Sequence, residues 1–173
     1  MQTLADELEP AAEAGTDAAF AELFHGHCAR LVRLAALLGA DDPEDVTQEA
    51  FARLYRIWHR LGDGDPAPYL RRIVVNLVRS RRRHLRVAWR RTPPEPSPLG
   101  SAEESVLLRE EHRAVLAALD RLPARQREAV VLRYWLELSE TEMAAAMGVA
   151  AGTVKSHLSR GVAAVGAIVG EQR

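Results

Sequence analysis

The sequence has a single cysteine, Cys28, so the chain contains no partner for an internal disulfide bond. A lone cysteine fits a reducing compartment, where disulfides are rare. The longest apolar stretches are only a few residues, far below the roughly 20 that a membrane-spanning helix requires. The chain also opens without the basic, apolar and small-residue series of a secretory signal. We therefore expect the protein in the cytoplasm.

Aromatic residues make up only 5% of the chain, and no run of alternating β-branched residues suggests a strand. Alanine and leucine are abundant instead, which favours an all-α fold. The apolar fraction of 47% is high enough to build hydrophobic cores, and it excludes wholesale disorder. With 173 residues, the chain has room for one medium domain or two small ones.

Lysine is almost absent, since Lys155 stands against 22 arginines, and no basic residue precedes Arg30. The formal net charge of -1 conceals a strong separation of charge along the chain. Residues 41–49 hold five acids and no base, whereas residues 71–91 hold nine arginines and no acid. A block this basic in a nearly neutral protein points to a polyanionic partner.

Apolar residues at spacings of three and four predict three helices in the first half of the chain. The first covers about 17–38, with Asp17 as its N-cap, and it ends at Gly39. The second begins at Asp42, because Asp can cap a helix and the next residue, proline, suits the first turn. A Gly- and Pro-rich stretch over 62–68 predicts a loop, and the third helix covers about 69–90.

On a helical wheel, the third helix has two opposite faces. Its apolar face carries Leu70, Ile73, Val74, Leu77, Val78 and Leu85. The opposite face, named here the arginine stripe, carries Arg72, Arg79, Arg83, Arg86 and Arg90, with Asn76 beside it. Such a stripe suits phosphates and a displaced single strand held by charge in a groove. A face that only meets solvent, or one that binds RNA, is the alternative.

Four prolines within residues 92–101 are too many for the interior of a helix or sheet, and they predict a semi-extended linker. The predicted organisation is an acidic flexible segment (1–16), a helical domain (17–91), the linker (92–101) and a second helical domain (102–173). The second domain should begin with a helix that ends near residue 121, followed by a helix that starts at Pro123.

The second domain carries the pattern of two helices joined by a tight turn. Ser139 and Glu142 have the spacing of a capping box, in which each side chain bonds to the backbone amide of the other residue. Gly148 can adopt the left-handed conformation that a sharp turn requires. Ala144, Gly148 and Val154 have the spacing of a helix-turn-helix, which needs a small residue, a glycine and an apolar plug at these positions.

The second helix of this pair, over about 151–168, combines an apolar stripe with a polar face. Val154, Leu158, Val162 and Val165 form the stripe. The polar face offers short or basic side chains that can reach phosphates and base edges, namely Thr153, Lys155, Ser156, His157, Ser159 and Arg160. Such a helix would place its N-terminal part in the major groove of DNA. The alternative is a pair of core helices joined by a tight turn.

These residues resemble domain 4 of the extracytoplasmic-function sigma factors, a group of the sigma-70 family. Within that group, the sequence is most similar in type to the actinobacterial sigma-E factors. The resemblance rests on Leu122-Pro123, Arg127, Leu132-Arg133-Tyr134, Leu138-Ser139, Glu142, Ala144 and residues 152–160 (GTVKSHLSR). Independently, residues 45–51 (DVTQEAF) resemble region 2.2 of that family and residues 69–76 (YLRRIVVN) its regions 2.3 to 2.4. Two motif sets in the family's order, across about residues 17–169, make the resemblance specific.

The resemblance implies a promoter-specificity subunit of RNA polymerase rather than an enzyme, with no cofactor and no metal. It implies that Asp45, Gln48, Glu49 and Phe51 bind the coiled coil of the polymerase β′ subunit. It implies that Leu61, Arg72, Asn76, Arg79, Arg83 and Arg86 read and hold open the -10 element of promoter DNA. It places domain 4 on the β flap, with Thr153, Lys155, Ser156, Ser159 and Arg160 reading the -35 element. An anti-sigma factor would be a further partner.

Two positions depart from the family's pattern. Leu61 and a Gly/Pro-rich loop stand where many relatives carry an aromatic residue, which leaves base stacking in that loop open and Trp58 or Tyr69 as alternatives. Ala150 replaces the Ser that commonly caps the recognition helix, and the loss of a cap hydroxyl costs about 1 kcal/mol.

Other functions receive less support from the sequence. His25, His27 and Cys28 lie close together, but a structural zinc site needs four ligands at suitable spacing. The acids of residues 41–49 could hold Mg²⁺ in a nuclease, yet no catalytic base or phosphate loop accompanies them, and a solvated face is the plainer alternative. The main rival is a helix-turn-helix regulator that occupies an operator without polymerase. Such regulators usually dimerise, and no dimerisation segment is visible.

Overall fold

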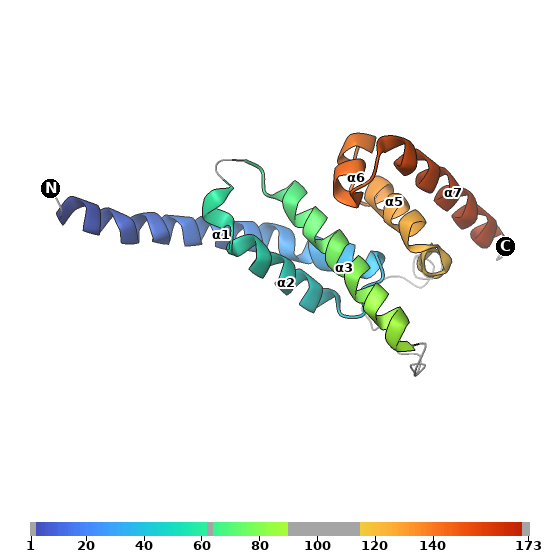
Figure 1. The fold of residues 1–173 in the computed structure, drawn as a ribbon, viewed down its shortest axis with the longest axis horizontal. Helices are drawn as coiled ribbons and strands as arrows, with labels where there is room; N and C mark the ends of the chain where they lie inside the picture. Colours follow the sequence, from blue (N-terminus) through green and yellow to red (C-terminus); the bar gives the residue numbers. More distant parts are fainter. Residues whose placement is uncertain (1–2, 62–63, 90–114, 171–173) are drawn as a thin grey trace, which may run out of the picture.

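A computed structural model describes residues 3–61, 64–89 and 115–170, and every regular element within these ranges is a helix (Figure 1). The elements are α1 (Thr3–Leu37), α2 (Pro43–Tyr55), the short 3-10 helix η1 (Trp58–Arg60), α3 (Ala67–Trp89), α5 (Ala124–Tyr134), α6 (Glu140–Met147) and α7 (Ala151–Gly170). Residues 115–121 are also helical. The predicted all-α fold is confirmed, while the predicted linker and most of the helix expected before residue 121 lie outside the described residues.

α1 begins earlier than its sequence pattern predicts. Asp17 does not cap a helix, because α1 continues back to residue 3 through a stretch rich in alanine and glutamate, which are good helix formers. The segment expected to be flexible is therefore helical from residue 3 onward. At the other end, Gly39 has a φ of 82°. Its amide donates to the Ala36 carbonyl (2.9 Å), and the Ala40 amide donates to the Ala35 carbonyl (2.9 Å), which together form a Schellman motif.

α2 begins where the sequence predicts. The Asp42 carboxylate accepts a hydrogen bond from the Asp45 amide (2.8 Å), and Pro43 occupies the first turn. The inward face of the helix is fully buried at Val46, Ala50 and Leu54. The helix stops at Tyr55 rather than continuing to Leu61, and η1 carries the chain onward.

α3 is the amphipathic helix that the sequence predicts. It starts two residues earlier than expected, at Ala67, whose amide donates to the Asp65 carboxylate (2.9 Å). Most of its predicted apolar face is buried, since Leu70, Ile73, Val74, Leu77 and Val78 are each at most 9% exposed. Leu85, near the end of the helix, is only half-buried. α3 packs against both α1 and α2, so the first three helices form one bundle.

α5, α6 and α7 form a second bundle, in which α5 starts directly after the proline that predicts it. α7 approaches α5 closely at Gly161. A Cβ at that position would lie 2.7 Å from the Val130 side chain and 3.0 Å from the Gln126 carbonyl oxygen. The absence of a side chain at Gly161 therefore allows the two helices to pack at this distance.

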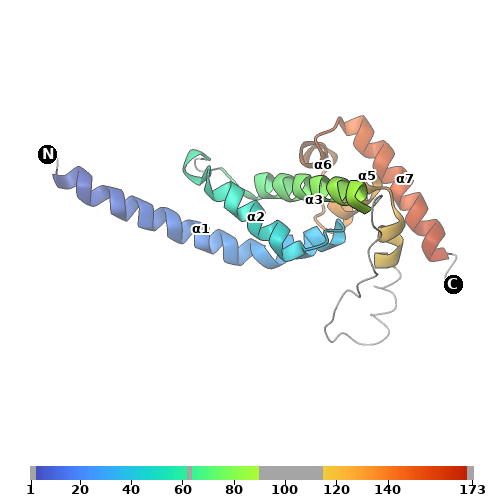
Figure 2. The same ribbon diagram turned by 60° about the horizontal axis from the view of Figure 1, so that its bottom comes forward.

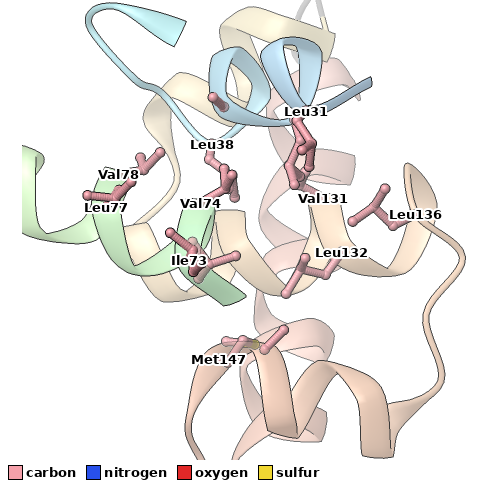
Figure 3. Packing of buried hydrophobic residues seen from close by; sticks show 14 of the residues in the cluster. Leu31, Leu38, Ile73, Val74, Leu77, Val78, Val131, Leu132, Leu136 and Met147 are labelled. Carbon is pink, nitrogen blue, oxygen red and sulfur yellow. The ribbon is translucent and has the colours of Figure 1, made fainter. Parts of the chain in front are cut away.

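The two bundles share one hydrophobic core. Figure 3 shows side chains of both bundles in a single cluster, with Leu31, Leu38, Ile73 and Val74 from the first and Val131, Leu132, Leu136 and Met147 from the second. α3 contacts α6 directly, and in both ribbon views α1 projects from the remaining helices toward the N-terminus (Figures 1 and 2). The two halves that the sequence separates therefore lie against each other.

Candidate nucleic-acid and protein interfaces

The turn between α6 and α7 has the geometry that the sequence predicts. The Ser139 hydroxyl accepts a hydrogen bond from the Glu142 amide (3.3 Å), and the Glu142 carboxylate accepts one from the Ser139 amide (2.9 Å), which completes the capping box. Hydrogen bonds from Ser139 lower the pKa of the Glu142 carboxyl. Gly148 then takes a left-handed φ of 66°, and its amide donates to the Ala144 carbonyl (2.9 Å).

α7 presents one face to the protein and another to solvent. Val154 is fully buried in the core, as expected of the apolar plug, and Leu158 packs against that core. Val162, also expected to face inward, is 41% exposed. The predicted DNA-reading side chains Thr153, Lys155, Ser156, Ser159 and Arg160 are all exposed. This face is therefore accessible to a partner, as a recognition helix requires, although a surface helix that only packs on a core also leaves its polar face in solvent.

The polar face of α7 makes few contacts within the protein. The Lys155 ammonium lies 3.4 Å from the Glu140 carboxylate, and these side chains are 67% and 45% exposed. The Ser156 hydroxyl donates to the Gly152 carbonyl (3.2 Å). Because an exposed ion pair contributes little to stability, Lys155 can exchange Glu140 for a phosphate at small cost.

The members of the arginine stripe differ in accessibility. Arg72, Asn76 and Arg83 are exposed. Arg79 is not, because its guanidinium pairs with Glu128 of α5 (2.9 Å), which leaves the arginine side chain 19% exposed. The Asn76 side-chain oxygen also accepts a hydrogen bond from Arg79 (3.1 Å). The Arg86 and Arg90 side chains lie outside the described residues.

Leu61 stands at the position where relatives carry an aromatic residue, and Trp58 and Tyr69 are the two side chains that could stack on a flipped base in its place. Leu61 follows η1 and is partly buried against the core. Trp58 also packs against the core, with its ring centroid 5.3 Å from that of Phe20 in an edge-on arrangement. Tyr69 is 39% exposed near the start of α3. Tyr69 is thus the most accessible of the three.

The four residues expected to bind a partner through α2 do not share one surface. Asp45 and Gln48 are exposed, and Glu49 is half-buried. Phe51 is 3% exposed in the hydrophobic core, where its ring lies 4.7 Å from that of Phe24. The expectation that Phe51 lies on the contact surface is therefore corrected, because its position on α2 turns its ring toward α1.

Arg81 of α3 holds the acidic face of α2 in place. Its guanidinium lies 2.5 Å from the Asp45 carboxylate and 2.6 Å from the Glu49 carboxylate, which Arg53 also contacts (2.6 Å). Hydrogen bonding to Arg81 lowers the pKa of the Glu49 carboxyl, and the same bond raises the pKa of Arg81. On the helical wheel Arg81 stands only about 20° from Leu70, on the packed face. A charged side chain on a packed helix face needs a partner of opposite charge. The position of Arg81 on the wheel could therefore have predicted its pairing with the acids of α2.

Comparison with known protein families matches two stretches of the chain. Residues 21–91 match the model of sigma-70 region 2, and residues 112–165 match that of sigma-70 region 4. The RNA polymerase sigma-E factor of Streptomyces antibioticus is 36% identical over 129 residues, which cover 70% of this chain and 67% of that protein. The ECF RNA polymerase sigma factor SigM of Mycobacterium tuberculosis is 34% identical over 167 residues, which cover 95% and 84%.

The chain belongs to the extracytoplasmic-function sigma factors. Solved structures with the same fold include the sigma factor RpoE of Bartonella quintana in complex with the anti-sigma factor NepR, with a TM-score of 0.75 and 23% identity over 89% of this sigma factor and 98% of that chain. CnrH in complex with the cytosolic domain of CnrY has a TM-score of 0.64 and 26% identity, covering 95% and 96%.

The histidine pair and the acidic residues are the remaining candidates for metal binding. The His25 Nδ1 lies 2.6 Å from the Ala21 carbonyl oxygen. Among the described residues, no three or more His, Cys, Asp or Glu side chains are arranged to hold a metal ion. Within the same ranges, no helix combines the length and the apolar character that crossing a lipid bilayer demands.

Proposed function

We propose that this sigma factor binds the core of RNA polymerase and directs initiation at promoters whose -10 and -35 elements it reads. The observation that carries the proposal is the capped helix-turn-helix, which leaves the polar face of α7 exposed. Polymerase core would supply the chemistry, so the sigma factor needs no catalytic residue and no cofactor of its own. It would act in the cytoplasm, where bacterial polymerase works on its template.

We assign the reading of the -35 element to α7. Its N-terminal half carries the exposed side chains Thr153, Lys155, Ser156, Ser159 and Arg160. Lys155 and Arg160 can contact phosphates or the acceptor edge of guanine, while the hydroxyls can contact phosphates or either kind of base edge. The helix would enter the major groove with its N-terminal half, as recognition helices do.

We assign the -10 element to α3 and the loop before it. Arg72, Asn76 and Arg83 are accessible. The helical wheel assigns Arg86 to the same side of the helix. Guanidinium groups along one helix can hold the phosphates of a displaced strand, and an amide such as that of Asn76 can read an extruded base. Leu61 would contribute an apolar contact beside that base rather than a stacking ring. Arg79 can join only after its pair with Glu128 opens.

We assign polymerase binding to the exposed acids of α2. Asp45, Gln48 and Glu49 would meet the coiled coil of the β′ subunit, and Phe51 would support them from the core side. Arg81 pairs with both acids, so a basic partner surface would compete with it for their carboxylates. The helix-turn-helix bundle, as the core of a domain spanning residues 102–173, would sit on the β flap.

An anti-sigma factor is a further proposed partner. The solved structures of RpoE and CnrH contain these proteins in complex with NepR and with the cytosolic domain of CnrY. This sigma factor shares their fold, and a partner of that kind would compete with polymerase core.

The test is run-off transcription with purified bacterial core polymerase over a genomic pool of promoters. We expect the sigma factor to bind core polymerase tightly, to bind promoter duplex weakly when alone, and to start transcripts at a small promoter set. The rival regulator would behave in the opposite way, binding duplex tightly without polymerase. An enzyme would act on nucleic acid without core, and either result would contradict the proposal.

A further inference from the structure

Two carboxylates of α2 are engaged by arginines of their own bundle. Nη2 of Arg81 on α3 lies 2.5 Å from Asp45 Oδ2 and 2.6 Å from Glu49 Oε2, so a single nitrogen bridges both acids. Arg53, one turn after Glu49 on α2, donates to the other oxygen, Oε1, through Nε (3.1 Å) and Nη2 (2.6 Å). Both oxygens of the Glu49 carboxylate are therefore occupied by guanidinium groups.

This pairing cancels the charge on part of the surface assigned to polymerase. The carboxylates of Asp45 and Glu49 carry two negative charges, and the guanidinium groups of Arg53 and Arg81 carry two positive ones. The acids still reach solvent, because the side chain of Asp45 is 58% exposed and that of Glu49 is 35% exposed. A partner thus meets two accessible carboxylates whose attraction for cations is offset from within the protein.

Arg81 is held at the acids more firmly than Arg53 is. Arg53 is 51% exposed and pairs with Glu49 over one turn of the same helix, and such pairs are weak in water. Arg81 is 25% exposed and reaches Glu49 from α3, 32 residues further along the chain. Leu77 and Val78, one turn before Arg81, are buried in the core, which fixes the backbone that carries it. The positive charge of Arg81 therefore stays beside both acids.

We propose that Arg81 is an internal competitor that weakens the binding of this sigma factor to polymerase core, because a basic group of the partner must displace it from Asp45 or Glu49. The inference rests on the proposed function, which assigns these acids to polymerase binding. Its consequence is an affinity for core that is lower, and less sensitive to salt, than the acids of α2 would give without Arg81.

Loss of the competitor should outweigh any loss of order in the acids. Asp45 and Glu49 stand on a helix that is capped by Asp42 and buried along its other face, so their backbone stays in place without Arg81. Two partly exposed ion pairs would no longer have to open when the partner binds. Since each exposed pair changes an equilibrium constant by at most about fivefold, we expect removal of the Arg81 charge to tighten core binding by about three- to tenfold.

Equilibrium binding of the dye-labelled full chain to purified bacterial core polymerase, measured by fluorescence anisotropy at several salt concentrations, tests the proposal. Arg81→Met removes the charge and keeps an apolar stem. It should tighten binding and make the affinity fall more steeply as salt rises. Arg81→Lys keeps the charge and should bind like the unsubstituted chain. Arg30→Met, at an exposed arginine of α1, removes the same charge elsewhere in the bundle and should change neither quantity.

A double-mutant cycle locates the effect at the acids. In an Asp45→Asn background one of the two carboxylates that Arg81 bridges has lost its charge, so the gain from Arg81→Met should shrink. A merely structural role of Arg81 would move neither the salt dependence nor this coupling. An equal gain in both backgrounds would overturn the proposal.

Unchanged or weaker core binding by a folded Arg81→Met chain would also overturn the proposal. Equal tightening by Arg30→Met would do so too, because it would trace the effect to net charge alone. Arg81→Gln, whose amide can still donate to the acids, is a second neutral variant with the same expected gain, and circular dichroism checks that both are folded. Failure of the unsubstituted chain to bind core would reject the proposed function, whereas normal binding without a response at position 81 would reject the competitor role alone.

Discussion

At the scale of single residues, the informative charges are those that α5 buries. Arg127 and Glu128 are neighbours in sequence and at most 5% exposed. Arg127 is paired with Asp120 and the end of α1, and Glu128 with Arg79 and Arg125. Buried charges are tolerated when every polar atom has a partner. Here part of each partner set comes from a helix far away in the chain, so the sequence alone shows two ordinary surface charges.

Ala150 offers a direct test of where α7 begins. Its carbonyl accepts hydrogen bonds from the Thr153 amide (2.9 Å) and the Val154 amide (3.1 Å), and its side chain has no atom that could cap the helix. Ala150→Ser should raise the free energy of unfolding of the second bundle by about 1 kcal/mol, because a hydroxyl can accept from a free amide of the first turn. Thermal unfolding measures the effect, and an equal or lower Tm would contradict this start.

Glu49 should make stability depend on pH on the acid side. Hydrogen bonding to Arg81 lowers its pKa in the folded state. The stabilisation is therefore present above the unfolded pKa of about 4.3, and it is lost as the pH falls through the lower folded value. Urea unfolding at several pH values should show a shallower acid-side decline for Glu49→Gln than for the unsubstituted chain. Glu44→Gln on the same helix is the control, and parallel curves for Glu49→Gln would refute the assignment.

At the scale of elements, the sequence predicted the helix ends that are determined by neighbouring residues. The Asp42 cap, the capping box of Ser139 and the left-handed Gly148 were all predictable, because each depends on residues within one turn. The start of α1 was missed, since a capping residue inside a stretch of good helix formers does not stop the helix. The burial of Phe51 was missed because a motif identifies a helix without saying which of its residues face inward.

The crossing of α5 and α7 provides a matched pair of glycine substitutions. Gly161→Ala places a Cβ 2.7 Å from Val130 and 3.0 Å from the Gln126 carbonyl oxygen, so it should lower the free energy of unfolding by about 1–3 kcal/mol. Gly166→Ala on the same helix meets nothing within 4 Å and should raise it by about 0.5–1 kcal/mol. Chemical denaturation compares the two, and equal stability of both variants would argue against the close crossing.

The polar face of α7 should matter for one promoter element only. Replacing Lys155 and Arg160 with Ala should weaken initiation that depends on the -35 element, by up to about 3 kcal/mol for each base-specific interaction that the change removes. Run-off transcription from a cognate promoter, compared with the same promoter carrying a scrambled -35 element, isolates the effect. Transcription untouched by the double change would show that α7 is not the recognition helix.

At the scale of the whole molecule, the two bundles pack against each other through α3, α5 and α6. The polar face of α7 is open, whereas the middle of the arginine stripe is covered by α5 and α6. The sequence separates the two bundles by a proline-rich stretch, and nothing local indicates that they meet. Their contact depends on pairs such as Arg79 with Glu128, which lie 49 residues apart.

The most direct test of the central claim is a pull-down of bacterial core polymerase by the purified, folded chain. The account predicts a stable one-to-one complex that Asp45→Asn and Gln48→Ala together weaken, while the exposed control Glu22→Gln leaves it intact. A well-folded chain, free of any inhibitor, that fails to retain core polymerase would contradict the account at its base.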